Sequence, residues 1–204
     1  MHSPYRIEVI PQPGETPPGY LLDDIEALGI SGVMRVERSA LYFVAGDLTP
    51  EAVERLCLSL LVDPIIQTAR WAEATYPVAT PADARRIEVG LLPGVTDTVA
   101  QNVLTRARML GIEGISAIGT GDSYLIYGQV EPENLVAIAE RLLHNPVIQY
   151  YRIGQLEPHI GVPVSYADPG AQVVPLADLD EASSWPFRGR DSFRWIWPRC
   201  VPFR

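Results

Sequence analysis

The chain has 204 residues, of which 47% are hydrophobic and 20% charged, and its formal net charge at pH 7 is −9. Such a composition is typical of a folded globular protein, and no stretch approaches the roughly 20 apolar residues of a membrane-spanning helix. The negative charge argues against a nucleic-acid partner, because neutralising phosphates requires clustered cations. The first residues lack the basic segment and apolar run of a secretory signal, so we expect a cytoplasmic protein without a membrane partner.

Two halves of the chain repeat one pattern. Arg6-Ile7-Glu8-Val9 recurs as Arg86-Ile87-Glu88-Val89, at an offset of 80 residues. Later matches are offset by 82 residues, such as Pro64-Ile65-Ile66-Gln67 with Pro146-Val147-Ile148-Gln149. A two-residue length change between the first turn and the first helix reconciles the offsets. We infer two tandem copies of one unit, at Tyr5–Ala69 and Arg85–Tyr151.

Each copy begins with a short apolar strand, at Ile7–Ile10 and Ile87–Leu92, and a Pro-Gly turn signal follows it. An amphipathic helix comes next, and in the second copy Thr98 and Gln101 have the spacing of a capping box. This helix is predicted to end at a left-handed glycine, which is Gly29 in one copy and Gly111 in the other.

The middle of each copy is predicted to form a hairpin. Two β-prone segments follow the helix in each copy, at Val33–Arg38 and Ala40–Ala45 and again at Ile115–Thr120 and Ser123–Tyr127. Gly119-Thr120-Gly121-Asp122 is interpreted as the turn of the second hairpin. These glycines could also belong to a phosphate-binding loop, but such a loop precedes a helix, so we favour the turn.

A second helix is predicted to start at Pro50 and at Pro132, because proline is well tolerated at the first helical position. Asp63-Pro64 and Asn145-Pro146 should stop it, and a last strand begins near Ile65 or Val147. The resulting β-α-β-β-α-β order is the α+β, ferredoxin-like arrangement. Because one copy alone would have a small core, we expect the copies to pack as a pseudo-dimer about an approximate two-fold axis.

This interpretation divides the chain into five parts. They are repeat 1 over residues 1–71, a linker over 72–84, repeat 2 over 85–156, a second linker over 157–183 and an irregular basic aromatic tail over 184–204.

Side chains that could perform chemistry do not converge in the sequence. His2, His144 and His159 are scattered, and His144 is expected to lie at a helix C-terminus for a structural reason. Cys57 falls on the apolar side of a helix and should be a small buried hydrophobic residue. With no CxxC motif we expect neither a disulfide framework nor a metal site. The acidic pairs on helices, such as Asp23-Asp24, are interpreted as solvated surface. We therefore predict no catalytic, cofactor-binding or metal-binding residue.

One cluster is a candidate for contact with a partner, namely Tyr150, Tyr151 and Arg152 near the end of the second copy. The alternative is that these are ordinary alternating strand residues, with one tyrosine buried.

Two segments of the second copy resemble the PurS family. They are the run Arg86-Ile87-Glu88-Val89-Gly90-Leu91-Leu92-Pro93-Gly94-Val95-Thr96-Asp97 and the later Asn145-Pro146-Val147-Ile148-Gln149. Members of this family are small subunits of phosphoribosylformylglycinamidine synthase, a glutamine-dependent ligase of purine biosynthesis. The unit occurs there as a dimer or as a tandem N-terminal domain of a longer synthase. Gln172–Asp180 is similar to the linker that follows such a tandem domain.

The resemblance implies a non-catalytic assembly module that holds the synthetase and glutaminase parts together so that ammonia can pass between them. ATP and Mg are then used by the complete synthase, and this chain itself holds no cofactor. The alternative function is a regulatory domain that binds a small metabolite at the seam between paired ferredoxin-like units.

The composition changes near Ser184. Residues 1–183 carry 11 arginines and 24 acidic residues, whereas residues 184–204 carry five arginines and a single acidic residue, Asp191. Residues 184–204 also contain three tryptophans. We hypothesise that the chain is an N-terminal piece of a longer synthase whose reading frame was lost or altered near Ala182. Alternatively, the tail is a basic aromatic docking segment for the acidic body or for a partner.

Overall fold

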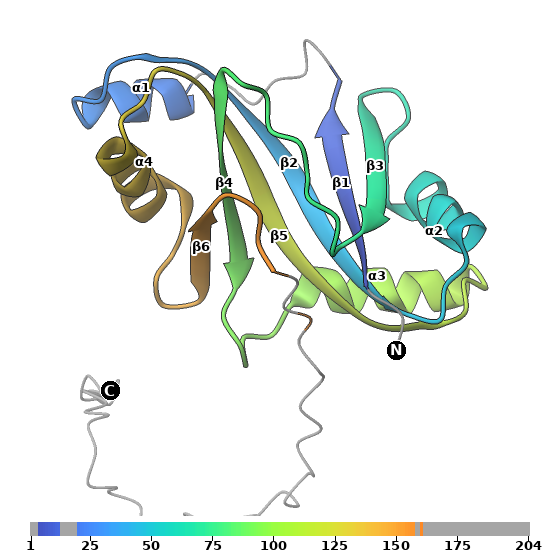
Figure 1. The fold of residues 1–204 in the computed structure, drawn as a ribbon. Helices are drawn as coiled ribbons and strands as arrows, with labels where there is room; N and C mark the ends of the chain where they lie inside the picture. The colour runs from blue at the N-terminus through green and yellow to red at the C-terminus, as the bar shows by residue number, and fades with distance from the viewer. Residues whose placement is uncertain (1–3, 13–19, 158–159, 161–204) are drawn as a thin grey trace, which may run out of the picture. The chain divides into compact units, whose positions relative to one another are not determined.

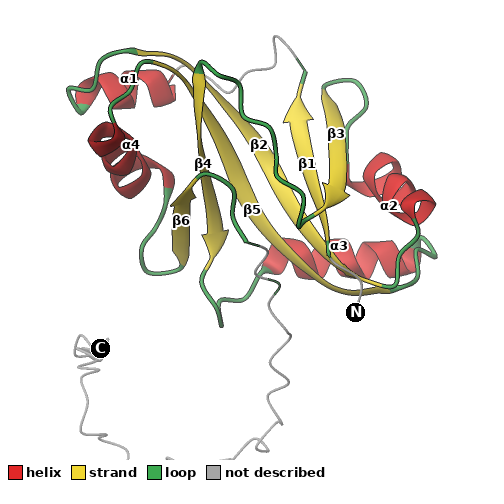
Figure 2. Ribbon diagram, in the orientation of Figure 1, coloured by secondary structure: helices red, strands yellow, loops and turns green. Residues whose placement is uncertain are grey.

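A computed structural model describes residues 4–12, 20–157 and 160. Predictions made for His2, His159 and residues 161–204 therefore lie outside the described residues. Figure 1 shows strands in one sheet with helices gathered at its two ends, and Figure 2 separates helices from strands by colour. No helix in the described segments is long and apolar enough to cross a membrane.

The elements of the first copy are β1 (Tyr5–Pro11), α1 (Tyr20–Ala27), β2 (Val33–Gly46), α2 (Pro50–Leu56), the π-helical turn η1 (Cys57–Leu61) and β3 (Gln67–Glu73). Those of the second are β4 (Ala84–Leu91), α3 (Thr98–Met109), β5 (Ile115–Gly128), α4 (Pro132–Ile138), the π-helical turn η2 (Ala139–Leu143) and β6 (Gln149–Ile153). Both copies therefore contain the same succession of elements, down to the π-helical turn.

Most of the predicted helix boundaries are confirmed. Pro50 and Pro132 occupy the first turn of α2 and α4. Gly29 and Gly111 follow α1 and α3 with φ angles of 77° and 66°, the left-handed conformation that costs glycine least. The capping prediction was wrong by one residue. The N-cap of α3 is Asp97, whose Oδ1 accepts a hydrogen bond from Ala100 N at 2.8 Å, so Thr98 is already helical.

The predicted hairpins were wrong. Val33–Gly46 and Ile115–Gly128 are each one continuous 14-residue strand, and the supposed turn Gly119-Thr120-Gly121-Asp122 lies inside β5. Instead of folding back on themselves, the two long strands pair with each other, antiparallel, along their length. Figure 1 shows them side by side at the centre of the sheet. Each strand thus finds a partner about 80 residues away that local sequence does not reveal.

All six strands form one antiparallel sheet in the order β3-β1-β2-β5-β4-β6. If β1, β2 and β3 are each replaced by their equivalents β4, β5 and β6, and the reverse, the same strand order results, now read from the opposite edge of the sheet. At the centre, Ala40 on β2 pairs with Asp122 on β5, and these two residues occupy equivalent positions in the repeat. Ile7 pairs with Tyr42 on β2, and Ile87 pairs with Tyr124 on β5. The strand pairings are therefore the same on both sides of the central pair.

Helices from different copies share each hydrophobic core. One core combines β1 residues Ile7 and Val9 with α2 residues such as Leu56 and α3 residues such as Val103. The other core combines residues of β4, α1 and α4. Residues on β2 that are an even number apart, Val36 and Val44, belong to different cores, so both cores lie on the same face of the sheet.

Each end of the sheet is consequently compatible with a ferredoxin-like unit, but with one that both copies build. At one end, β3, β1 and the second half of β2 are completed by α3 and the first half of β5. The fully buried aliphatic side chains of these cores, including Ile7 and Ile87 at 0% exposure, each contribute roughly 1.5–3 kcal/mol relative to exposure. Neither copy can bury this surface alone, because its own first helix packs at the other end.

Candidate partner-contact site

The three residues predicted as a contact site lie on β6, the strand at one edge of the sheet. Tyr150 and Tyr151 are half-buried and Arg152 is exposed. Because side chains alternate along a strand, the two tyrosines project from opposite faces. Tyr151 packs against the helix-bearing core. Tyr150 packs on the other face, beside the small apolar cluster that includes Phe43 and Leu156.

Tyr151 is held by two groups that follow α4. Its hydroxyl donates a hydrogen bond to Glu140 Oε1 at 3.1 Å, and its ring lies 4.8 Å from that of His144, measured between centroids. His144 in turn has its Nδ1 2.7 Å from Ala139 O. This arrangement agrees with the structural role expected for His144 at a helix C-terminus.

The Tyr150 ring lies over a glycine. Tyr150 pairs across the strands with Gly90 on β4, and a Cβ atom at Gly90 would come within 3.1 Å of the Tyr150 ring and 3.2 Å of Leu156. At the equivalent place in the first copy, Ile10 on β1 pairs with Thr68 on β3. The larger residue is therefore on the first strand of the first copy but on the last strand of the second copy. The aromatic ring at this position is therefore specific to the second copy.

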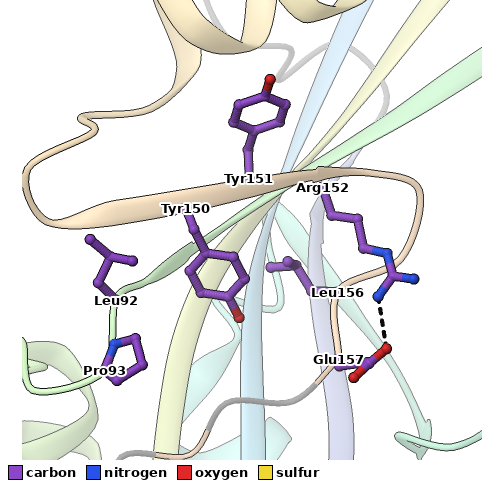
Figure 3. Close-up of a pocket in the computed structure, with 7 residues that line it drawn as sticks. All are labelled: Leu92, Pro93, Tyr150, Tyr151, Arg152, Leu156 and Glu157. Carbon is purple, nitrogen blue, oxygen red and sulfur yellow. Dashed lines mark hydrogen bonds and ion pairs between the residues drawn. The ribbon is translucent and has the colours of Figure 1, made fainter.

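A pocket of about 470 Å³ opens beside Tyr150. Leu92, Pro93, Tyr150, Tyr151, Arg152, Leu156 and Glu157 line it. Figure 3 shows the Tyr150 ring between the side chains of Leu92 and Pro93 on one side and Leu156 on the other. Leu156 is only 2% exposed and forms an apolar wall. The structure thus brings the three predicted residues together around one pocket.

A charged pair lies at the edge of this pocket. Arg152 Nη1 donates to Glu157 Oε1 at 2.9 Å, and the two side chains are 53% and 88% exposed. Such an exposed pair contributes less than about 1 kcal/mol and can exchange partners readily. Burial raises the pKa of Tyr150, and the carboxylates of Glu157 and Glu88 raise it further. The Tyr150 hydroxyl is therefore a neutral hydrogen-bond donor at physiological pH.

Taken together, the site offers an aromatic ring, apolar walls, a neutral hydroxyl and an exposed guanidinium, which suit recognition of another molecule.

In the described residues no group of three or more His, Cys, Asp or Glu side chains is arranged to hold a metal ion. Cys57 is 3% exposed, as predicted, and burial raises the pKa of its thiol to about 11.

Sequence reasoning missed two sets of residues. The first set is the remainder of the pocket, Leu92, Pro93, Leu156 and Glu157, which the fold collects from two segments. The second is a buried charged cluster of Arg6, Glu8, Arg86 and Glu88 on the sheet face opposite the helices. A signal for the cluster was present, because Arg and Glu alternate with buried apolar residues in both copies of the Arg-Ile-Glu-Val motif.

The described residues form an α+β protein in which two similar successions of elements share one antiparallel sheet, and a pocket lies beside an edge strand. Residues 84–157 match the sequence model of the PurS family, described as phosphoribosylformylglycinamidine (FGAM) synthase. The match spans about a third of the chain and confirms the predicted resemblance for the second copy. Residues 84–157 are therefore similar to a part of FGAM synthase. A search of the curated proteins found no significant match.

Proposed function

We propose that this chain is a non-catalytic assembly module of FGAM synthase that bridges the synthetase and glutaminase parts of the enzyme. The observation that carries the proposal is the PurS match over residues 84–157, which contains both β6 and the contact pocket. In this proposal ATP and Mg²⁺ act in the complete synthase rather than in this chain, and the protein works in the cytoplasm.

The proposal includes a covalently joined pseudo-dimer. The reversible strand order, the pairing of Ala40 with the equivalent residue Asp122, and the exchange of helices between the cores support it. A single sheet with two similar ends would allow one chain to bind two larger parts, the synthetase and the glutaminase. The hypothesis that the chain is a piece of a longer synthase, altered near Ala182, remains part of the proposal. Resequencing the locus tests it, and an intact stop codon without a downstream synthetase frame would contradict it.

The partner surface is proposed to be the β6 pocket, because its aromatic ring has no counterpart in the first copy. At equivalent positions, β6 carries Tyr150, Tyr151 and Arg152 where β3 carries Thr68, Ala69 and Arg70. Of these positions, Tyr150 and Arg152 on β6 and Thr68 and Arg70 on β3 lie outside the two helix-bearing cores, so they can be substituted without changing either core.

Pulldown with separately produced synthetase and glutaminase subunits tests the proposal. We expect the full chain to retain at least one subunit, and Arg152→Ala combined with Tyr150→Thr to reduce retention at least tenfold. Arg70→Ala combined with Thr68→Ala is the matched control at the opposite edge and should bind as the unmodified chain does. Equal losses from both pairs of substitutions would refute the assignment of the surface, and failure to retain either subunit would refute the assembly role.

The alternative function, a metabolite-binding regulatory domain, is tested by calorimetry with amino acids and nucleotides. Saturable binding of one of them, together with no retention of a subunit, would replace the proposed function. The pocket lies at the β6 edge and not at the β2–β5 seam where this alternative placed its ligand.

A further inference from the structure

Two arginines and two glutamates are buried on the sheet face that carries no helices. Arg6 and Glu8 belong to β1, Arg86 and Glu88 belong to β4, and none of the four is more than 4% exposed. We call these four residues the crossed charge cluster. The strands β1 and β4 are not neighbours, because β2 and β5 lie between them. The side chains therefore interact across the centre of the sheet.

Each arginine pairs with the glutamate of the other copy. Arg6 makes a two-pronged contact with Glu88, with Nη2 at 2.6 Å from Oε1 and Nη1 at 3.0 Å from Oε2. Arg86 Nη1 lies 3.3 Å from Glu8 Oε1 and 3.2 Å from Glu88 Oε1. The two copies are thus joined by charge-assisted hydrogen bonds in addition to their backbone pairing.

Small residues on the central strands leave space for these contacts and take part in them. Ser39 on β2 donates to Glu8 Oε1 at 3.1 Å, and Ser123 on β5 accepts from Arg86 Nη1 at 2.7 Å. Ser123 is fully buried.

Two segments that cross this face close the cluster from solvent. In the connection between the copies, Ala79 O and Thr80 Oγ1 accept from Arg86 at 3.2 and 3.3 Å. Beyond β6, Leu156 N donates to Glu88 Oε2 at 2.8 Å. Gln155 links the two segments, since its Oε1 accepts from Val78 N at 2.9 Å. The only buried side-chain nitrogen or oxygen without a partner among the described residues is Arg6 Nε.

Burial of a charged cluster of this kind is not by itself a source of net stability. The cost of removing four charged groups from water largely offsets their mutual attraction, so apolar residues of similar volume could replace them with little loss. Breaking one pair, in contrast, leaves a buried charge without a partner and is costly. An advantage that remains open to the cluster is the exclusion of other arrangements of the same two copies.

The arrangement that most needs exclusion is a shifted register of β2 on β5. The centre of β5 reads Thr120-Gly121-Asp122-Ser123, and strands that are polar and glycine-rich specify register weakly. A slip of two residues keeps every side chain on its original face, so the alternation of apolar and polar residues does not oppose it, although the packing of α1 and α3 in the opposite copies' cores does. The same slip moves β1 by roughly 7 Å relative to β4. That displacement separates Arg6 from Glu88.

We infer that the crossed charge cluster fixes the register in which the two copies share their sheet. Disulfide trapping in the full chain tests this inference, with Cys57→Ala and Cys200→Ser as the background. Ala40→Cys with Asp122→Cys reports the native register, because these residues pair directly. Ala40→Cys with Thr120→Cys reports a slip of two residues, since diagonal positions in the native register are too far apart for a disulfide.

We expect mild oxidation to trap the native pair at least tenfold more than the slipped pair in the chain with its cluster intact. Arg6→Met combined with Glu88→Met removes one crossed pair without leaving a lone charge, and should raise the slipped product at least fivefold. Circular dichroism identifies which variants are folded. An unchanged product ratio in a folded Met variant would overturn the inference.

Discussion

The aromatic ring of Tyr150 lies over Gly90, its cross-strand neighbour, and occupies space that any other residue at position 90 would fill with a Cβ atom. We predict that Gly90→Ile lowers the free energy of unfolding by about 1–3 kcal/mol, because the added side chain displaces the ring. Combining it with Tyr150→Thr reproduces the Ile10–Thr68 pair of the first copy and should recover most of the loss. Urea titration measures both effects. A double variant no more stable than Gly90→Ile alone would contradict this account of the ring's position.

Glu88 bonds to both Arg6 and Arg86 and is 0% exposed. We predict that Glu88→Gln costs about 3–5 kcal/mol, because it leaves two buried guanidinium groups with a single countercharge, that of Glu8. The comparison is Asp122→Asn, which weakens the pair between Arg38, with a side chain 51% exposed, and Asp122, with one 24% exposed. That substitution should cost less than about 1 kcal/mol. Equal losses of stability from Glu88→Gln and Asp122→Asn in denaturant titrations would show that breaking the buried cluster costs no more than breaking an exposed pair.

Asp97 stabilises two elements at once. Its Oδ1 caps α3 at Ala100 N, and its Oδ2 accepts from the backbone N and the hydroxyl of Thr120 on β5, both at 2.8 Å. Asp97→Ala should therefore lower stability by about 2–3 kcal/mol, above the ~1 kcal/mol typical of a cap alone. Glu131→Ala is the control, since the side chain of this N-cap residue makes no capping hydrogen bond with α4. A loss from Asp97→Ala as small as that from Glu131→Ala in thermal or urea unfolding would refute the double role.

Cys57 is predicted to resist thiol reagents in the folded protein. With a pKa of about 11, only about 0.1% of this thiol is ionised at pH 8, against about a tenth for a cysteine with the ordinary value of 9.0. In a Cys200→Ser background, we expect Cys57 to be alkylated at least 100-fold faster in denaturant than in buffer. Mass spectrometry measures the alkylated fraction over time. Comparable rates in the two conditions would mean that the α2–η1 helix opens readily around Cys57.

The same thiol affects stability in alkaline solution. Burial raises the pKa of Cys57 from 9.0 to about 11 in the folded state, so the folded protein retains a proton that the unfolded chain has lost. The contribution of the protonated Cys57 thiol to the free energy of unfolding is complete below pH 9 and declines between pH 9 and about 11. The unmodified chain should therefore lose stability faster over this interval than Cys57→Ala, by up to about 1.4 kcal/mol per pH unit. Parallel pH profiles from the two proteins would contradict the assigned shift.

Local signals in the sequence predicted many features that the structure confirms. The left-handed glycines Gly29 and Gly111 and the helix starts at Pro50 and Pro132 depend on backbone geometry within a few residues, which is why they could be found. The Asp97 cap was missed by one residue because Thr98 offers a similar signal. The residues of the candidate site were named from sequence, but the pocket around them includes Leu92 and Leu156, which only the fold brings together.

The hairpin prediction failed for a physical reason. Strand propensity indicates that Val33–Gly46 is extended, but an extended segment can turn back on itself or continue straight. Ser39 and Ala40 give only a weak turn signal, and in the second copy Gly121 and Asp122 are good turn formers that still continue as a strand. The pairing of β2 with β5 decides between these outcomes, and it joins residues roughly 80 positions apart.

By itself, the sequence predicted two copies of one α+β unit, most of the helix boundaries and a likeness to the PurS family, because each of these predictions depends on short motifs and on residues that recur at a fixed offset. Only the tertiary structure decided that the long strands run straight, that α3 and α1 complete the cores of the opposite copies, and that Arg6 is buried against Glu88. These contacts bring together distant groups whose favourable interactions exist only after both copies are folded.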